Sequence, residues 1–109
     1  MIRVGINGFG RIGRCLARHI MSERSDMELV QVNASGGRDT NIHLLKYDSV
    51  HGRYTGPIQD PILWTQERDI SKIKWYNVDI VFECTGAFRD GDICMHHISG
   101  GANKVVISS

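Results

Sequence analysis

Short apolar runs and a segment of helical periodicity open this chain. Residues 2–7 and 27–33 are compact apolar runs, and each predicts a strand. Residues 10–22 lie between them and predict a helix, with Arg14 and Arg18 on a side that faces solvent or an interface. The apolar side of this helix, at 3.6-residue spacing, is predicted to comprise Ile12, Cys15, Leu16, His19 and Ile20.

The alternation continues through the rest of the chain. Asp39 or Thr40 is the predicted N-cap of a second helix, which follows a glycine-rich loop. Its apolar and aromatic residues are Ile42, Leu44, Leu45 and Tyr47. Residues 48–61 predict irregular chain because they are rich in Gly and Pro. The elements predicted after them are a short strand at 62–66, a helical turn at 71–75 beginning near Asp69, a buried strand at 79–84, a helix at 90–99 closed by Gly100 and Gly101, and a last strand at 104–108.

Strands that alternate with helices favour a parallel sheet with right-handed crossovers and helices on both faces. The predicted fold class is therefore α/β, a doubly wound and mostly parallel sheet. Ligands of such sheets bind beyond the carboxyl ends of the strands. Four predicted strand ends carry small or polar residues, namely Asn7-Gly8, Asn33-Ala34, Thr85-Gly86 and Ser108.

A glycine motif follows the first predicted strand directly. Gly8-Phe9-Gly10-Arg11-Ile12-Gly13 has the spacing Gly-x-Gly-x-x-Gly. In this pattern the first glycine permits a tight turn, the second lets the backbone approach phosphates, and the third lets the helix pack against the strand. The amides at the start of the helix then face an anion. The motif predicts a site for the pyrophosphate of a dinucleotide, and a purely structural glycine-rich turn is the alternative.

Composition and charge argue against several other classes of protein. With 109 residues, 41% of them hydrophobic, the chain is expected to form one soluble globular domain. No stretch approaches the roughly 18 to 20 apolar residues of a membrane span. A net charge of +1 with dispersed basic residues gives no electrostatic basis for binding nucleic acid. Three scattered cysteines and no secretory leader predict a cytoplasmic location.

Five motifs together resemble a known family. They are Ile6–Arg14, Lys46–Tyr54, Gln66–Asp69, Glu83–Gly86 and Lys104–Ser108. They occur in the order seen in phosphorylating glyceraldehyde-3-phosphate dehydrogenases, and the resemblance covers essentially the whole chain. It implies a truncated Rossmann-type fold in which residues 1–109 form the amino-terminal NAD(P)-binding domain and the catalytic domain is absent.

The same resemblance implies which residues contact the cofactor. Asn7, Gly8, Phe9, Gly10, Arg11 and Ile12 would line the pyrophosphate and ribose, with backbone amides near Arg11 and Ile12 as the main donors. Arg68 would lie near the adenine end. Thr85, Gly86 and Ser108 would lie along the ribose and nicotinamide side.

The resemblance further implies an oxidoreductase of glucose metabolism and glycolysis as the parent protein, a cytoplasmic homotetramer. It would oxidise glyceraldehyde 3-phosphate with phosphate to 1,3-bisphosphoglycerate, by thiolate attack and hydride transfer to NAD(P). The family's nucleophilic cysteine and histidine base are expected beyond Ser109, so this chain alone is predicted to be inactive and Cys84 is not the nucleophile. Two alternatives remain: erythrose-4-phosphate dehydrogenase, and an isolated dinucleotide-binding or interaction module without catalysis.

The chain departs from the family's pattern in two places. The family usually ends its second strand with Asn-Asp, whose carboxylate accepts hydrogen bonds from the adenosine ribose, whereas this chain has Asn33-Ala34. Losing the carboxylate also removes a charge that would repel a 2′-phosphate, and Ser35 to Arg38 offer a hydroxyl, amides and a cation. NADP is therefore a plausible cofactor beside NAD. The second departure is a shorter segment between Gly56 and Gln66, where the family commonly forms a hairpin.

Other polar side chains have simpler interpretations. Cys94 to His97 cannot all point at one ion from a single helix, so no metal site is predicted. Asp48, Ser49 and His51 are expected to stabilise a loop by hydrogen bonds and not to form a catalytic triad. Glu83 is predicted to be a buried carboxylate whose charge is satisfied by a neighbouring amide or arginine.

Overall fold

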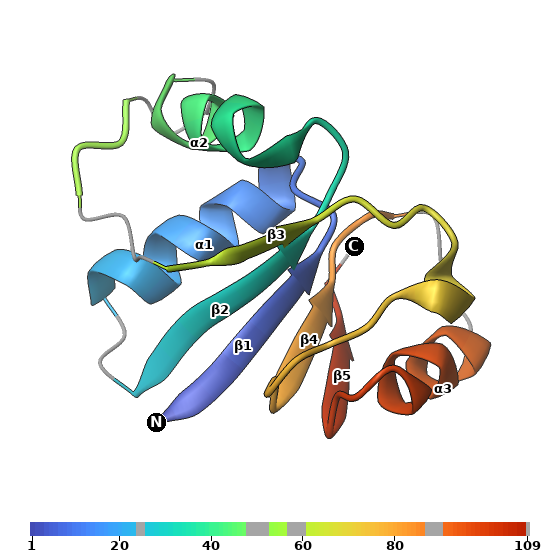
Figure 1. The fold of residues 1–109 in the computed structure, drawn as a ribbon. Coiled ribbons are helices and arrows are strands. Elements are labelled where there is room, and N and C mark those ends of the chain that lie inside the picture. The colour runs from blue at the N-terminus through green and yellow to red at the C-terminus, as the bar shows by residue number, and fades with distance from the viewer. Residues whose placement is uncertain (24–25, 48–52, 57–60, 87–90, 109) are drawn as a thin grey trace.

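Five parallel strands form one sheet in the order β3-β2-β1-β4-β5 (Figure 1). The computed structural model describes residues 1–23, 26–47, 53–56, 61–86 and 91–108. The strands are β1 Ile2–Asn7, β2 Met27–Asn33, β3 Leu63–Thr65, β4 Ile80–Glu83 and β5 Lys104–Ile107. The strand order reverses between β1 and β4, as a doubly wound sheet requires, so the predicted fold class is confirmed.

Three helices and one short 3₁₀ turn connect the described strands. The helices are α1 Arg11–Glu23, α2 Gly37–Tyr47 and α3 Gly91–Ser99, and the 3₁₀ turn is η1 Ile70–Lys72. Asp69 caps η1 by accepting a hydrogen bond from the backbone amide of Ser71. The predicted cap of α2 was wrong, because the helix begins at Gly37 and Asp39 already lies in its first turn. Gly36 and Gly37 turn the chain into α2 with positive φ angles, which a sequence pattern of caps does not reveal.

The two faces of the sheet carry separate apolar cores. The first core joins α1 and α2 to one face, and its buried members include Val4, Ile6, Ala17, Ile20, Leu29, Val32 and Leu45. The second core lies on the opposite face, with Ile73, Trp75, Val78, Val81 and Ala102. Burial on both faces explains why the strands read as continuous apolar runs and not as alternating ones.

The predicted apolar side of α1 was right for Leu16 and Ile20 and wrong for the other three residues. Ile12, Cys15 and His19 are exposed, and Ile12 keeps 47% of its surface accessible. The side that packs on the sheet consists of Gly13, Ala17, Ile20 and Met21. Small residues at two of these positions allow the helix to approach the sheet closely, and this close contact sets the rotation of the helix.

Arg14 and Arg18 also differ from prediction, because neither is a freely solvated side chain. The Arg18 guanidinium is buried and donates to the carbonyl of Leu45 from Nε (3.1 Å) and Nη2 (2.6 Å). It also lies over the ring of Tyr54, 5.2 Å from the centroid. Arg14 is partly buried and donates to the carbonyl of Phe9 at 3.0 Å. These contacts tie α1 to α2 and to the glycine loop.

Candidate functional site

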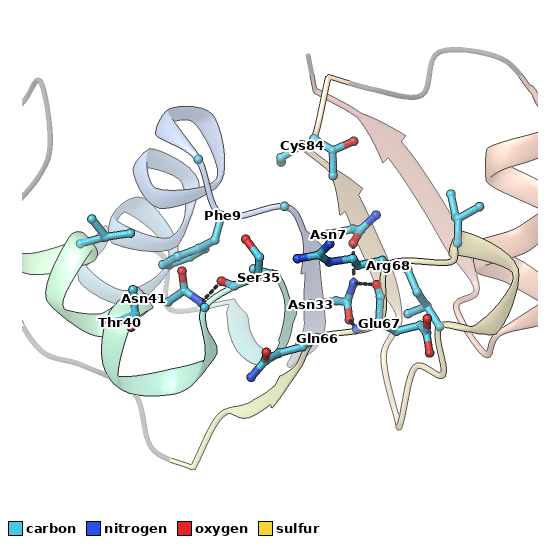
Figure 2. A pocket seen from close by; sticks show the side chains of 18 residues that line it. Asn7, Phe9, Asn33, Ser35, Thr40, Asn41, Gln66, Glu67, Arg68 and Cys84 are labelled. Carbon is cyan, nitrogen blue, oxygen red and sulfur yellow. Dashed lines mark hydrogen bonds between the residues drawn. The ribbon is translucent and has the colours of Figure 1, made fainter.

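A cavity of about 530 Å³ lies beyond the carboxyl ends of β1, β2 and β4 (Figure 2). This is the point where the strand order reverses, which is where doubly wound sheets bind ligands. The cavity is lined by eight of the residues predicted for the cofactor site: Asn7, Gly8, Phe9, Gly10, Ala34, Ser35, Arg68 and Thr85. The fold therefore brings together segments that are far apart in the sequence.

The four other predicted residues do not line this cavity. Arg11 and Ile12 expose their side chains in the first turn of α1. Their backbone amides, with that of Gly13, lack intrahelical acceptors, because the ladder of α1 starts with Arg14 donating to the carbonyl of Gly10 at 2.9 Å. Gly86 follows Thr85 with φ +74°, and Ser108 donates its amide to the carbonyl of Glu83 at the end of β5.

Sequence reasoning missed much of the wall on the side of α2 and η1. The additional lining residues are Asn33, Gly36, Thr40, Asn41, Leu44, Gln66, Glu67, Ile70, Ile73 and Cys84. Figure 2 shows Thr40 and Asn41 on α2 facing Glu67 and Arg68 across the pocket. Asn41 is buried and donates to the carbonyls of Ser35 (2.9 Å) and Gly37 (2.7 Å). The sequence offered one sign of this wall, the polar residue Asn41 inside a predicted helix. The sequence alone did not show toward which side of the helix the Asn41 side chain would point.

The three glycines of the motif have three different surroundings. Gly8 has φ +95°, and a Cβ there would lie 2.7 Å from Cγ2 of Thr85, so only glycine fits this turn. A Cβ on Gly13 would overlap the carbonyl oxygen of Gly8, so the third glycine allows α1 to pack against the strand exit. A Cβ on Gly10 would meet nothing within 4 Å. The open space at Gly10 is therefore available to a ligand that approaches the backbone closely.

Asn33 organises the floor of the cavity between β2 and the segment after β3. Its Oδ1 accepts from the Thr65 hydroxyl (2.7 Å) and from the Glu67 amide (2.9 Å). Its Nδ2 donates to the Glu67 carbonyl (2.8 Å) and to Oδ1 of Asn7 (2.9 Å). These bonds hold residues 65–67 beside the end of β2, and Arg68 follows directly. The Arg68 guanidinium is exposed and forms no hydrogen bond or ion pair with the residues that the structure describes.

Glu83 is fully buried at the end of β4, as predicted, and its carboxylate is satisfied. Burial opposes ionisation, but hydrogen bonds from His97, Asn7 and Thr85 outweigh it and hold the pKa of Glu83 below its ordinary value. The partners are side chains and one backbone amide, not the arginine that the sequence also allowed.

Cys84, next in the chain, is a buried thiol at the edge of the cavity. Burial raises its pKa to about 11, and the neighbouring charge of Glu83 adds to the increase. The side chain therefore keeps its proton at neutral pH and is a poor nucleophile.

Other chemistry finds little support in the described part of the chain. No three His, Cys, Asp or Glu side chains there come together as a metal site, and His97 points to Glu83 instead. None of the described helices is long and apolar enough to cross a membrane. Asp48, Ser49 and His51 lie outside the described residues, so their predicted loop-stabilising role stays a prediction.

Comparison with known proteins decides between the families that use such a cavity. Residues 2–91 match the family model described as glyceraldehyde 3-phosphate dehydrogenase, NAD binding domain. The chain belongs to the glyceraldehyde-3-phosphate dehydrogenase family. It corresponds to the NAD-binding domain of that family, which confirms the resemblance carried by the five motifs.

Individual relatives agree with this assignment. Glyceraldehyde-3-phosphate dehydrogenase of Cereibacter sphaeroides is 41% identical over 119 residues, and the cytosolic enzyme of Trypanosoma brucei brucei is 44% identical over 120 residues. Each match covers 99% of this chain and 36% of the relative, so the chain spans about a third of the length of these enzymes. Both alignments are longer than the 109-residue chain, so these relatives have residues that it lacks. That the missing residues fall between Gly56 and Gln66 stays a prediction.

Proposed function

We propose that this chain binds a nicotinamide adenine dinucleotide in the cavity at the ends of β1, β2 and β4. The observation that carries the proposal is the open space at Gly10. The other two glycines of the motif have structural reasons, because Gly8 has a positive φ angle and a Cβ on Gly13 would overlap the carbonyl oxygen of Gly8. The amides of Arg11, Ile12 and Gly13 at the start of α1 would bind the pyrophosphate, because helix N-termini attract anions. Arg68 and the end of β2 would hold the adenosine, and Thr85, Gly86 and Ser108 would lie toward the nicotinamide.

Gly10→Ala tests the proposed pyrophosphate site. The added methyl group meets no protein atom, so the melting temperature should fall by no more than the loss of a glycine N-cap explains, while the affinity for NAD falls at least about tenfold, or about 1.4 kcal/mol. Isothermal titration calorimetry measures the affinity, and thermal unfolding measures stability. Gly13→Ala is the matched control. Its methyl group overlaps the carbonyl oxygen of Gly8, so this variant should lower the melting temperature. Equal NAD affinity of Gly10→Ala and the unmodified chain would contradict the site.

We also propose that the cavity accepts NADP as well as NAD. Ala34 lines the cavity at the end of β2, where the family usually has a carboxylate, and Ser35 lines it beside Ala34. Arg38 is the nearby cation; its Nη1 is 3.0 Å from the Asp39 carboxylate, and both side chains are exposed. Such an exposed pair contributes little, so Arg38 can turn to another anion at small cost.

Ala34→Asp tests the cofactor preference. An aspartate there would repel a 2′-phosphate and accept hydrogen bonds from a ribose diol, so NADP affinity should fall at least about tenfold while NAD affinity rises or stays constant. Parallel titrations of both cofactors into both chains provide the measurement. If the unmodified chain binds NAD much more tightly than NADP, the proposal of NADP acceptance is wrong.

For the parent protein we propose the reaction named for its relatives, the oxidation of glyceraldehyde 3-phosphate. Both relatives described above carry that enzyme's name, which favours this substrate over erythrose 4-phosphate. The cofactor would accept the hydride, and the nucleophile and base would come from residues that this chain does not contain. A homotetramer in the cytoplasm is part of the same proposal, and the Trypanosoma relative is named as cytosolic.

A further inference from the structure

A chain of buried hydrogen bonds crosses the sheet beneath the cavity. From one side, the Thr65 hydroxyl donates to Asn33 (2.7 Å), Asn33 donates to Asn7 (2.9 Å), and Asn7 Nδ2 donates to Oε1 of Glu83 (2.7 Å). Asn33, Asn7 and Glu83 occupy paired positions on β2, β1 and β4, so their side chains share one face of the sheet. Every bond in this row points toward the Glu83 carboxylate.

A second row of bonds reaches the same carboxylate from the second core, which contains Trp75. Trp75 Nε1 donates to Nδ1 of His97 at 3.1 Å, and an indole N–H is only a donor, so Nδ1 must be the acceptor. His97 therefore carries its proton on Nε2, which lies 2.8 Å from Oε1 of Glu83. His97 is fully buried and Trp75 is 4% exposed, so the tautomer is fixed inside the protein.

The other oxygen of Glu83 holds the exit of β4. Oε2 accepts from the Thr85 amide at 3.1 Å and from the Thr85 hydroxyl at 2.7 Å. Glu83 thus accepts four hydrogen bonds, two on each oxygen, and donates none. Glu83 does not line the cavity, but Asn7, Asn33 and Thr85 do, and Asn33 reaches Glu83 through Asn7.

We propose that Glu83 is a positioning residue for dinucleotide binding. Its carboxylate orients Asn7 and Thr85 directly and Asn33 through Asn7, so the three strand exits that line the cavity are held in one arrangement before the ligand arrives. This inference rests on the proposed function. Preorganisation of this kind raises affinity because the ligand does not have to order the groups that it contacts.

Only a carboxylate satisfies this arrangement. In Glu83→Gln, an amide NH₂ in place of Oε2 would face the backbone N–H of Thr85, and in place of Oε1 it would face the donors of Asn7 and His97. Turning Asn7 around would move the conflict to Asn33, because each amide in the row already donates to the next. A neutral side chain of the same shape therefore disorders the cavity wall without removing any packing volume.

The test compares the affinity for NAD with stability in the 109-residue chain. Glu83→Gln should weaken NAD binding at least about tenfold. Gln31→Leu is the matched control: Gln31 is also fully buried on the same sheet, and its two bonds, to the Lys74 carbonyl (2.7 Å) and from the Tyr76 amide (3.0 Å), lie outside the cavity. This control should lower the melting temperature while NAD affinity stays within about twofold.

Two further measurements keep the test decisive if Glu83→Gln does not fold. Glu83→Asp keeps the charge but moves the carboxylate oxygens away from Asn7 and Thr85. This variant should fold and bind NAD more weakly than the unmodified chain. Gln31→Leu should not show this loss of NAD affinity. In the unmodified chain, long-range ¹H–¹⁵N spectra should find the ring proton of His97 on Nε2 and none on Nδ1. A proton on Nδ1 would overturn the network itself.

The outcomes separate this inference from the proposed function. If the unmodified chain does not bind NAD or NADP, the proposed function is wrong. If it binds NAD and the Glu83 variants bind equally well, or if Gln31→Leu loses as much affinity as they do, the positioning role of Glu83 is wrong and the dinucleotide site stands.

Discussion

Cys15 and Cys84 are the same side chain in opposite surroundings. Cys15 is exposed on α1, whereas Cys84 is buried beside the Glu83 carboxylate. Residue type alone makes both of them candidate nucleophiles, but low dielectric and a neighbouring negative charge both oppose formation of a thiolate. The surroundings therefore decide the chemistry of Cys84, and those surroundings exist only in the folded chain.

Alkylation as a function of pH should separate the two thiols. With its pKa raised to about 11, Cys84 has a thiolate fraction of about one in a thousand at pH 8. Iodoacetamide should modify Cys15 at pH 8 and leave Cys84 unmodified until the pH approaches its pKa or the chain unfolds. Peptide mass spectrometry measures both sites in one sample. Equal modification of both thiols in the folded chain at pH 8 would contradict the buried environment.

The sign of the corresponding stability effect follows from the same pKa. Because the folded state holds the Cys84 proton more tightly than the unfolded chain, the stability linked to this thiol is fully present below the unfolded pKa. It is lost as the pH rises from that value through about 11. Cys84 thus limits stability on the alkaline side only.

At the scale of elements, α1 shows how a correct helix prediction can give a partly incorrect face. The periodicity of residues 10–22 predicted the helix, and α1 spans Arg11–Glu23. The pattern placed Ile12 and Cys15 inside, yet the helix turns Ala17 and Gly13 toward the sheet. A hydrophobic pattern shows which residues are apolar. Close packing of a helix against a strand exit instead selects small residues, and the sequence pattern does not show where the backbone comes that close.

Arg18→Met should measure the connection between α1 and α2. The substitution keeps the long stem but removes two hydrogen bonds to the Leu45 carbonyl and the contact with Tyr54, so we expect a loss of about 1–3 kcal/mol in unfolding free energy. Arg11→Met, at an exposed position on the same helix, should change stability by less than about 0.5 kcal/mol. Urea unfolding followed by circular dichroism measures both. Similar values for the two variants would contradict the role of Arg18.

At the scale of the whole molecule, the described residues gather around one cavity at the carboxyl edge of the sheet. The sheet brings together around one cavity the glycine loop, the side-chain amides of Asn7 and Asn33, and the cation of Arg68. The one thiol that lines it is protonated at neutral pH, and the buried histidine donates to a carboxylate beneath the floor. We therefore expect these groups to hold a cofactor and not to carry out a reaction.

The purified 109-residue chain should therefore bind NAD without reducing it. With glyceraldehyde 3-phosphate and inorganic phosphate present, absorbance at the wavelength of the reduced cofactor should not rise above the rate without protein. A relative's full-length enzyme serves as the positive control in the same assay. Turnover by the chain alone, abolished by Gly10→Ala, would show that catalysis does not need residues outside it.

The sequence by itself determined the order of elements, the parallel fold and the glycine loop. Strands at 2–7 and 27–33 coincide with β1 and β2, because a strand buried on both faces leaves a local apolar signal. The glycine motif, the strand ends and the resemblance to the family together identified eight lining residues.

The tertiary structure decided the rotation of α1, the start of α2, and the wall supplied by Asn41 and Glu67. It also decided the hydrogen-bond network that ends on Glu83, whose members His97 and Asn33 are 64 positions apart in the sequence. Periodicity and motifs record what a residue contributes locally. Which donor meets which acceptor depends on contacts between distant segments, and those contacts exist only once the sheet has formed.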